Sequence, residues 1–252
     1  MNWGPVIKEF EGFLKLEKGL SKNSVEAYLA DMGKLTSFLE NEDIRLEPGE
    51  LEQEHLQLFL VWINNNGLSA RSQARILSGI KAFYRFLLMD EQIDKDPTAL
   101  LESPKLGRKL PEVLTVQEIN DILGNIDLSK PEGRRNKAML EVLYSCGLRV
   151  SELVGLKLSN IYRPEEFIRV IGKGDKERFV PISTKAMKEI DLYMPDRNSL
   201  EIQPGQEDVL FLNRRGHMLS REMVFMVLKK LAKEAGIKKS VSPHTFRHSF
   251  AT

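Results

Sequence analysis

Apolar residues recur every three or four positions through most of the chain, which is the period of an amphipathic helix. In the first hundred residues this pattern, bounded by Gly, Pro, Asn and Ser signals, predicts four helices. They cover 5–18, 22–40, 51–65 and 69–90. We therefore predict a helical first domain over residues 1–102.

The pattern changes in the second half of the chain. Residues 167–171 and 178–182 alternate like short strands and flank a glycine-rich turn, which predicts a β-hairpin. Helical patterns cover 116–125, 134–145, 184–192 and 220–235, and Ser242-Pro begins another. Residues 103–111, with two prolines and three basic residues, are typical of a linker. The predicted fold is mainly α with a small β-sheet or hairpin (α+β). It comprises two domains, 1–102 and 112–252, joined by the linker.

Composition narrows the class of protein. The hydrophobic fraction is 42%, as in globular proteins, and no apolar run reaches the roughly 20 residues of a membrane span. The N-terminus lacks the apolar core of a signal peptide, and Cys146 is the single cysteine. We expect a cytoplasmic protein without a membrane partner.

Charge divides unevenly between the two predicted domains. Residues 1–102 carry 11 basic and 17 acidic residues, whereas residues 103–252 carry 26 and 19. A basic half next to an acidic half is a weak indication of nucleic-acid contact.

A row of arginines follows one face of the predicted helix 69–90. Arg71, Arg75 and Arg85 lie opposite its apolar stripe. They form either a solvated face or a surface that binds DNA phosphates and base edges. The linker residues Lys105, Arg108 and Lys109 are further candidates for phosphate contact.

The segment 143–156 carries the chain's most informative arginine. Gly147 is placed to end a helix with positive φ, and Ser151 to cap the next helix, with Glu152 in its first turn. Arg149 lies between these two predicted helices. It is either a surface residue beside a helix junction or a guanidinium aimed at a phosphate.

Three more basic groups complete a candidate active site. Lys173 lies between the two glycines of the hairpin turn, and His244 and Arg247 share a face of the last helix. Two arginines, a lysine and a histidine suit a reaction that develops negative charge on phosphorus, because they bind oxygens and move protons. We expect no cofactor and no metal. His244 and His248 are spaced as zinc ligands, but no third ligand accompanies them.

These residues stand in motifs that resemble the tyrosine recombinase (λ-integrase-type) superfamily, most closely its bacterial Xer branch of the XerD type. The motifs are Ser103-Pro-Lys-Leu106, Lys137-Ala-Met-Leu-Glu-Val-Leu-Tyr144, Gly147-Leu-Arg-Val-Ser-Glu-Leu-Val-Gly-Leu156, Val170-Ile-Gly-Lys-Gly174, Ser242-Pro-His244 and Arg247-His248.

The resemblance implies a role for each residue of the candidate site. Arg149 and Arg247 would bind the scissile phosphate, and Lys173 would protonate the 5′-hydroxyl. His244 would assist proton transfer. Glu152 would orient the first arginine, with His248 in support.

The resemblance also implies cutting and rejoining of DNA through a 3′-phosphotyrosyl intermediate, resolving chromosome or plasmid dimers at a dif-like site. It implies that the two domains form a C-shaped DNA clamp. The implied partners are double-stranded DNA, further protomers in a tetramer on DNA, and a septum-associated DNA translocase. The family's nucleophile is a tyrosine beyond the second arginine, whereas the five tyrosines of this sequence all precede Arg247. We therefore expect a C-terminally truncated catalytic domain that binds DNA without cleaving it. A phage or transposon integrase and a non-enzymatic DNA-binding protein remain alternatives.

Overall fold

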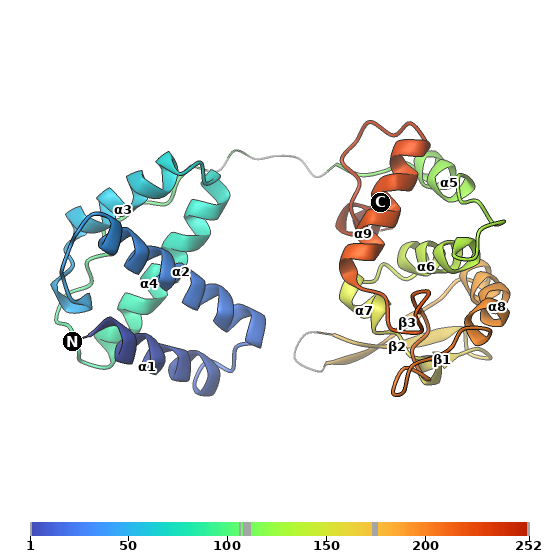
Figure 1. Cartoon of the computed structure of the whole chain (residues 1–252), viewed down its shortest axis with the longest axis horizontal. Helices are drawn as coiled ribbons and strands as arrows, with labels where there is room; N and C mark the ends of the chain where they lie inside the picture. Colours follow the sequence, from blue (N-terminus) through green and yellow to red (C-terminus); the bar gives the residue numbers. More distant parts are fainter. Residues whose placement is uncertain (1, 106, 108–111, 173–175, 251–252) are drawn as a thin grey trace. The chain divides into compact units, whose positions relative to one another are not determined.

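The computed structural model describes residues 2–105, 107, 112–172 and 176–250. The chain divides into two compact units, Met1–Lys109 and Leu110–Thr252, each with its own hydrophobic core (Figure 1). Within the described ranges, no helix is long and apolar enough to cross a membrane.

Unit 1 consists of helices packed around one core. The helices are α1 (Trp3–Leu16), α2 (Lys22–Asn41), α3 (Gln53–Asn65) and α4 (Ala70–Met89), with a 3₁₀ turn at Pro48–Glu50. Aromatic side chains dominate the core, where Phe10 contacts Phe83 edge-to-face and Phe38 contacts Phe59. The predicted helical half of the fold is confirmed, with helix ends within two residues of the expected ones.

An ion pair that the sequence did not reveal joins α2 to α4. Arg75 donates two hydrogen bonds to the carboxylate of Asp31, at 2.7 and 2.6 Å. Asp31 is almost fully buried, and a Cβ on Gly79 would lie 2.7 Å from its Oδ2. The glycine therefore makes room for the carboxylate between the two helices.

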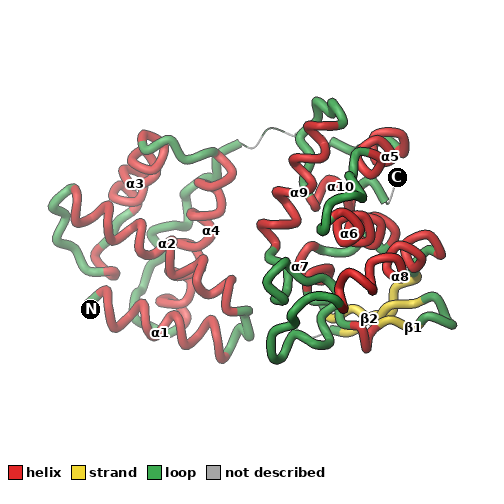
Figure 2. Tube along the Cα trace, turned by 45° about the vertical axis from the view of Figure 1, so that its right-hand side comes forward, coloured by secondary structure: helices red, strands yellow, loops and turns green. Residues whose placement is uncertain are grey.

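Unit 2 surrounds a buried central helix, α6 (Gly133–Ser145), which contacts α5 (Val116–Gly124), α7 (Val150–Val154), α8 (Thr184–Asn198) and α10 (Pro243–His248). Helix α9 (Arg221–Glu234) contacts α5, α7 and α10. Figure 2 shows the strands gathered on one side of this helical layer, next to α8. The predicted combination of helices with a small β-sheet is confirmed.

The sheet is antiparallel, with the order β1 (Ile161–Tyr162), β2 (Phe167–Ile171) and β3 (Glu177–Pro181). β2 and β3 form the predicted hairpin, whereas the two-residue β1 is too short for an alternating pattern to reveal it. Val170 pairs with Arg178 in the register. Ile168 and Val170 are buried, so side chains at paired positions 170 and 178 point toward the core side of the sheet.

Gly147 ends α6 in the predicted conformation, with φ +53°. A Cβ at this position would also lie 2.7 Å from Cδ1 of Phe250. We expect Gly147→Ala to lower the free energy of unfolding by about 1–2 kcal/mol through the left-handed backbone alone. Displacement of the Phe250 ring adds to that loss.

Gly236 provides the matched control, because its φ is +71° and an added Cβ meets nothing within 4 Å. Urea denaturation of Gly147→Ala and Gly236→Ala separates the backbone effect from the Phe250 contact. Equal losses in the two variants would show that the ring moves away freely.

Candidate active site

Arg149 occupies the N-cap position of α7, immediately before the helix begins at Val150. The prediction that Ser151 caps this helix is wrong. Glu152 fills the capping role instead, because its Oε2 accepts a hydrogen bond of 2.7 Å from the Arg149 backbone N–H. Glu152 Oε1 also accepts one of 2.9 Å from Nη1 of the Arg149 side chain. One carboxylate thus fixes both the backbone and the guanidinium of Arg149.

Glu152 lies among three arginines from three separate elements. Besides Arg149, it receives two parallel hydrogen bonds from Arg178 of β3, each 2.9 Å long. Arg247 of α10 places Nη1 4.0 Å from Glu152 Oε2, which is too far for a hydrogen bond. Three guanidinium groups and one carboxylate leave an excess charge of +2.

The electrostatics of this cluster keep Glu152 ionised. Burial alone would raise its pKa, but hydrogen bonds from Arg178 and Arg149 outweigh that effect and lower the pKa of Glu152 to about 2. Because the folded-state pKa is depressed, the stability that this carboxylate contributes is present at neutral pH. It is lost only as pH falls from about 4.5 through about 2.

Unlike Arg149 and Arg178, Arg247 makes no hydrogen bond to Glu152. Among the described residues, its buried Nη1 has no hydrogen-bond partner. Burial, followed by repulsion from Arg149, lowers the pKa of Arg247. A buried donor without an acceptor is costly, and an anionic ligand would satisfy it. The cluster is therefore suited to binding a phosphate group.

Two histidines extend the site along α10. The rings of His244 and His248 lie with centroids 4.4 Å apart, and both residues are exposed. Pro243 at the first helical position and the Ser242 side chain, which accepts from the Thr245 N–H, fix the start of this helix. His244 and Arg247 thus come from one short, well-capped helix.

The predicted residue Lys173 lies outside the described residues. The base of its hairpin turn is described: the Gly172 N–H donates to the Lys176 carbonyl at 2.8 Å. A Cβ on Gly172 would lie 3.4 Å from Arg178 Nη1 and 3.7 Å from Glu152 Oε1. The turn therefore begins directly against the arginine cluster.

The predicted DNA-contact residues belong to the other unit. Arg71 and Arg85 are exposed on α4, and Lys105 is exposed after it. Arg75 is bound to Asp31. Arg108 and Lys109 lie outside the described residues. DNA contact by these residues stays a prediction.

The described nucleophile candidates all serve packing. Tyr144 contacts Phe246 and Phe250 edge-on, Tyr162 contacts Phe179, and Tyr193 stacks on Phe211. Burial raises the pKa of the Cys146 thiol to about 12, so it stays protonated. The remaining tyrosines, Tyr28 and Tyr84, belong to unit 1.

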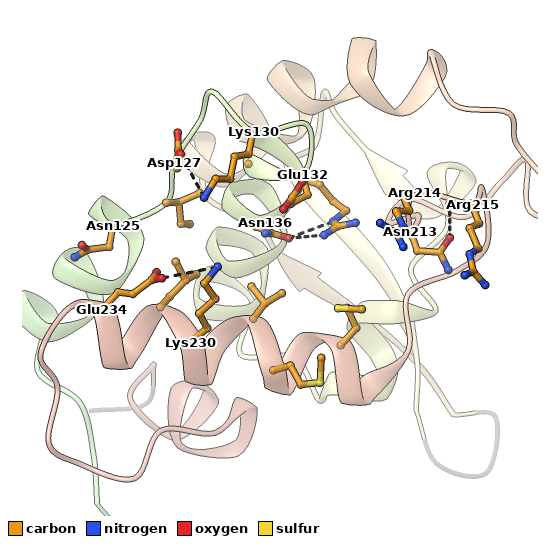
Figure 3. A pocket seen from close by; sticks show the side chains of 17 residues that line it. Asn125, Asp127, Lys130, Glu132, Asn136, Asn213, Arg214, Arg215, Lys230 and Glu234 are labelled. Carbon is orange, nitrogen blue, oxygen red and sulfur yellow. Dashed lines mark hydrogen bonds and ion pairs between the residues drawn. The ribbon is translucent and has the colours of Figure 1, made fainter.

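A pocket of about 760 Å³ lies elsewhere in unit 2 (Figure 3). Its walls come from the segment before α6, the turn 213–215 and one face of α9. The buried Arg135 in this pocket donates to Asn136 and to the Leu212 carbonyl. None of the four residues of the arginine cluster lines it, so the candidate chemistry does not lie in this cavity.

Arg178 is the site residue that the sequence interpretation missed. β3 exposes Glu177, Phe179 and Pro181, whereas positions 178 and 180 alternate toward the core side. An arginine at such a position needs an anionic partner. The alternation along β3 could have indicated that Arg178 faces the core side of the sheet, but it does not identify Glu152 as its partner.

Comparison with known proteins identifies the family. Residues 112–252 match the Phage integrase family, and residues 7–91 match the N-terminal SAM-like domain of phage integrases. The chain belongs to the phage integrase family. It is 39% identical over 248 residues to "Tyrosine recombinase XerD" of Listeria innocua, covering 98% of this chain and 84% of that protein. It is 40% identical over 247 residues to the protein of that name from Staphylococcus saprophyticus, covering 98% and 83%.

Solved structures show the same fold. The XerH site-specific recombinase bound to palindromic difH substrate has a TM-score of 0.77 at 21% identity, covering 98% of this chain and 72% of that chain. A λ integrase dimer bound to a COC′ core site has a TM-score of 0.76 at 17% identity, covering 100% and 89%. The family membership and the relatives make this chain a site-specific tyrosine recombinase, an enzyme of DNA strand exchange. The arginine cluster around Glu152 is the candidate active site of this recombinase.

Proposed function

We propose that this recombinase exchanges strands at a dif-like site and thereby resolves chromosome or plasmid dimers. The observation that carries the proposal is the arginine cluster, with its excess positive charge and the Nη1 of Arg247 that has no hydrogen-bond partner among the described residues. It is supported by relatives named XerD that are about 40% identical over nearly the whole chain.

Arg149 and Arg247 would hold the two non-bridging oxygens of the scissile phosphate. Attack on phosphorus adds negative charge to those oxygens, so donors that are already in place stabilise the transition state more than the ground state. His244, three residues before Arg247 on α10, would move a proton at the same phosphate. Lys173 would protonate the leaving 5′-oxygen, a role that rests on the family resemblance alone.

The partners follow from the same proposal. Double-stranded DNA would contact both domains, 1–102 and 112–252, which the linker 103–111 joins. Further protomers would join it on DNA, just as λ integrase binds its core site as a dimer. A septum-associated DNA translocase and a cytoplasmic location stay predictions based on the resemblance. A phage or transposon integrase would use the same chemistry on a different site.

DNA binding tests the proposal and the arginine row together. We expect the 252-residue chain to bind a dif-like duplex more tightly than a scrambled duplex, as measured by fluorescence anisotropy. Arg71→Ala and Arg85→Ala should each weaken binding and reduce the slope of log K against log salt by about 1, because each removes one phosphate contact.

Arg45→Ala is the matched control, since Arg45 is exposed in the same unit but lies on the segment after α2, where it pairs with Asp43. An unchanged slope in the α4 variants would show that the arginine row is only a solvated face. Equal binding to both duplexes would count against a dif-like target.

A further inference from the structure

We infer that Arg178 is a positioning residue that saturates Glu152 and so keeps Arg247 free for the phosphate. The inference rests on the proposed phosphate-binding role of Arg247. It assigns a function to a residue that neither the family motifs nor the sequence interpretation singled out.

The geometry supplies the argument. A carboxylate offers about four acceptor sites, two on each oxygen. In Glu152, Oε1 accepts from Arg149 Nη1 and Arg178 Nη1. Oε2 accepts from the Arg149 backbone N–H and Arg178 Nη2. All four sites are occupied, and two of the four donors belong to Arg178.

The position of Arg247 agrees with this count. Its Nη1 lies only 4.0 Å from Oε2, yet it makes no hydrogen bond to it. If Arg178 were absent, two acceptor sites on a buried carboxylate would open next to a cation that has an unused donor. Arg247 would then move onto Glu152, because unsatisfied acceptor sites on a buried carboxylate are costly. The same movement would withdraw it from the phosphate.

Arg178 also ties the hairpin to the cluster. It lies on β3, five residues after Lys173, and its Nη1 lies 3.4 Å from the position that a Cβ on Gly172 would occupy. The two parallel hydrogen bonds from Arg178 to Glu152 therefore join the base of the hairpin turn to α7 and hold the sheet against that helix.

Sulfate binding provides the test, because sulfate is a dianion at every pH used and needs no cleavage. The arginine Nε–H resonances of the ¹⁵N-labelled chain are followed during titration with sodium sulfate at constant ionic strength. We expect Arg178→Gln to weaken sulfate binding about tenfold, the effect of one lost charge-assisted hydrogen bond. Arg178→Lys keeps the charge but cannot donate two parallel hydrogen bonds to Glu152, so it should also weaken sulfate binding several-fold.

A double variant distinguishes positioning from general damage. In Glu152→Gln/Arg178→Gln the side chain at 152 no longer carries the charge that attracts Arg247. This variant should therefore bind sulfate more tightly than Arg178→Gln alone. If the double variant binds more weakly than either single variant, Arg178 is merely structural and the inference fails.

A second readout follows the carboxylate itself, which faces Arg149, Arg178 and Arg247. In ¹³C-glutamate-labelled protein, the carboxyl resonance that disappears in Glu152→Gln reports its titration. If Arg247 takes the place of Arg178 beside Glu152, the pKa of Glu152 should stay below its usual range in Arg178→Gln and rise clearly only in Arg178→Gln/Arg247→Ala. A pKa that rises as far in Arg178→Gln as in that double variant would contradict the inference.

Arg169→Gln is the matched control. Arg169 lies on β2 and donates to Asn160, so its loss perturbs the sheet without touching Glu152. Its sulfate affinity should equal that of the wild type. If Arg178→Gln does not fold, Arg178→Lys carries the test.

The inference and the proposed function fail in different ways. Wild-type sulfate affinity in both Arg178 variants, with lost affinity in Arg247→Ala, overturns only the role of Arg178. Wild-type affinity in Arg247→Ala overturns the phosphate site itself.

Discussion

Replacement of Arg247 by alanine, tested in a form of this recombinase that cleaves DNA, should slow DNA cleavage by about 10²–10³-fold, the usual loss when one transition-state donor is removed. The buried Nη1 of Arg247 has no partner among the described residues, so its hydrogen-bonding capacity is available for the phosphate. Binding to the DNA site should change little, because many other phosphate contacts contribute to it. Single-turnover cleavage of a nicked suicide duplex measures the rate, and anisotropy measures binding.

Arg163→Ala is a suitable control for this measurement. Arg163 is an arginine of the same unit whose partner is the exposed Asp191, and an exposed ion pair contributes little. Its cleavage rate should stay within about twofold of the wild type. A wild-type cleavage rate in Arg247→Ala would contradict the assignment of Arg247 to the scissile phosphate.

Local sequence patterns predicted the local backbone geometry around Arg149 and Arg247, since each lies in a short contiguous segment. The roles of these residues stay a prediction. The left-handed Gly147 and the adjacent Arg149 belong to one helix junction, whose chemistry is readable from composition. His244 and Arg247 share one face of a helix that begins at Ser242-Pro. The predicted N-cap, Ser151, lies two residues after the observed one, Arg149. A serine is a good cap, but the hydrogen bond from the Arg149 N–H to the Glu152 side chain determines where the helix begins.

Contacts between distant segments could not be predicted in the same way. Arg178 meets Glu152 only because the β2–β3 register places position 178 on the core side, 26 residues away from its partner. The pairing of Arg75 with Asp31 spans 44 residues. A helical row of arginines looks uniform in sequence, and all three members are exposed in the structure. Only packing shows that Arg75 is held by a buried carboxylate.

Because Arg75 is paired with Asp31, a charge reversal at Arg75 would change the stability of unit 1 as well as any DNA binding. Asp31 is almost fully buried, and Arg75 donates two hydrogen bonds to its carboxylate at 2.7 and 2.6 Å, with Lys34 at 3.9 Å. Arg75→Glu would place a second carboxylate beside a buried one. Although half of the Arg75 side chain is exposed, this change leaves the buried Asp31 carboxylate without its main counter-charge, so we expect it to lower the free energy of unfolding of unit 1 by about 3 kcal/mol.

Thermal and urea unfolding of Arg75→Glu, Arg71→Glu and the double variant Asp31→Asn/Arg75→Gln should separate the two effects. Arg71→Glu should unfold like the wild type, because its side chain is exposed and forms no salt bridge within the described residues. The double variant should recover most of the stability, since it removes both charges of the pair. If Arg75→Glu is as stable as Arg71→Glu, the contact with Asp31 contributes little and Arg75 is available to DNA. If it is much less stable, any loss of DNA binding in that variant reflects unfolding, and the arginine row must be tested through Arg71 and Arg85.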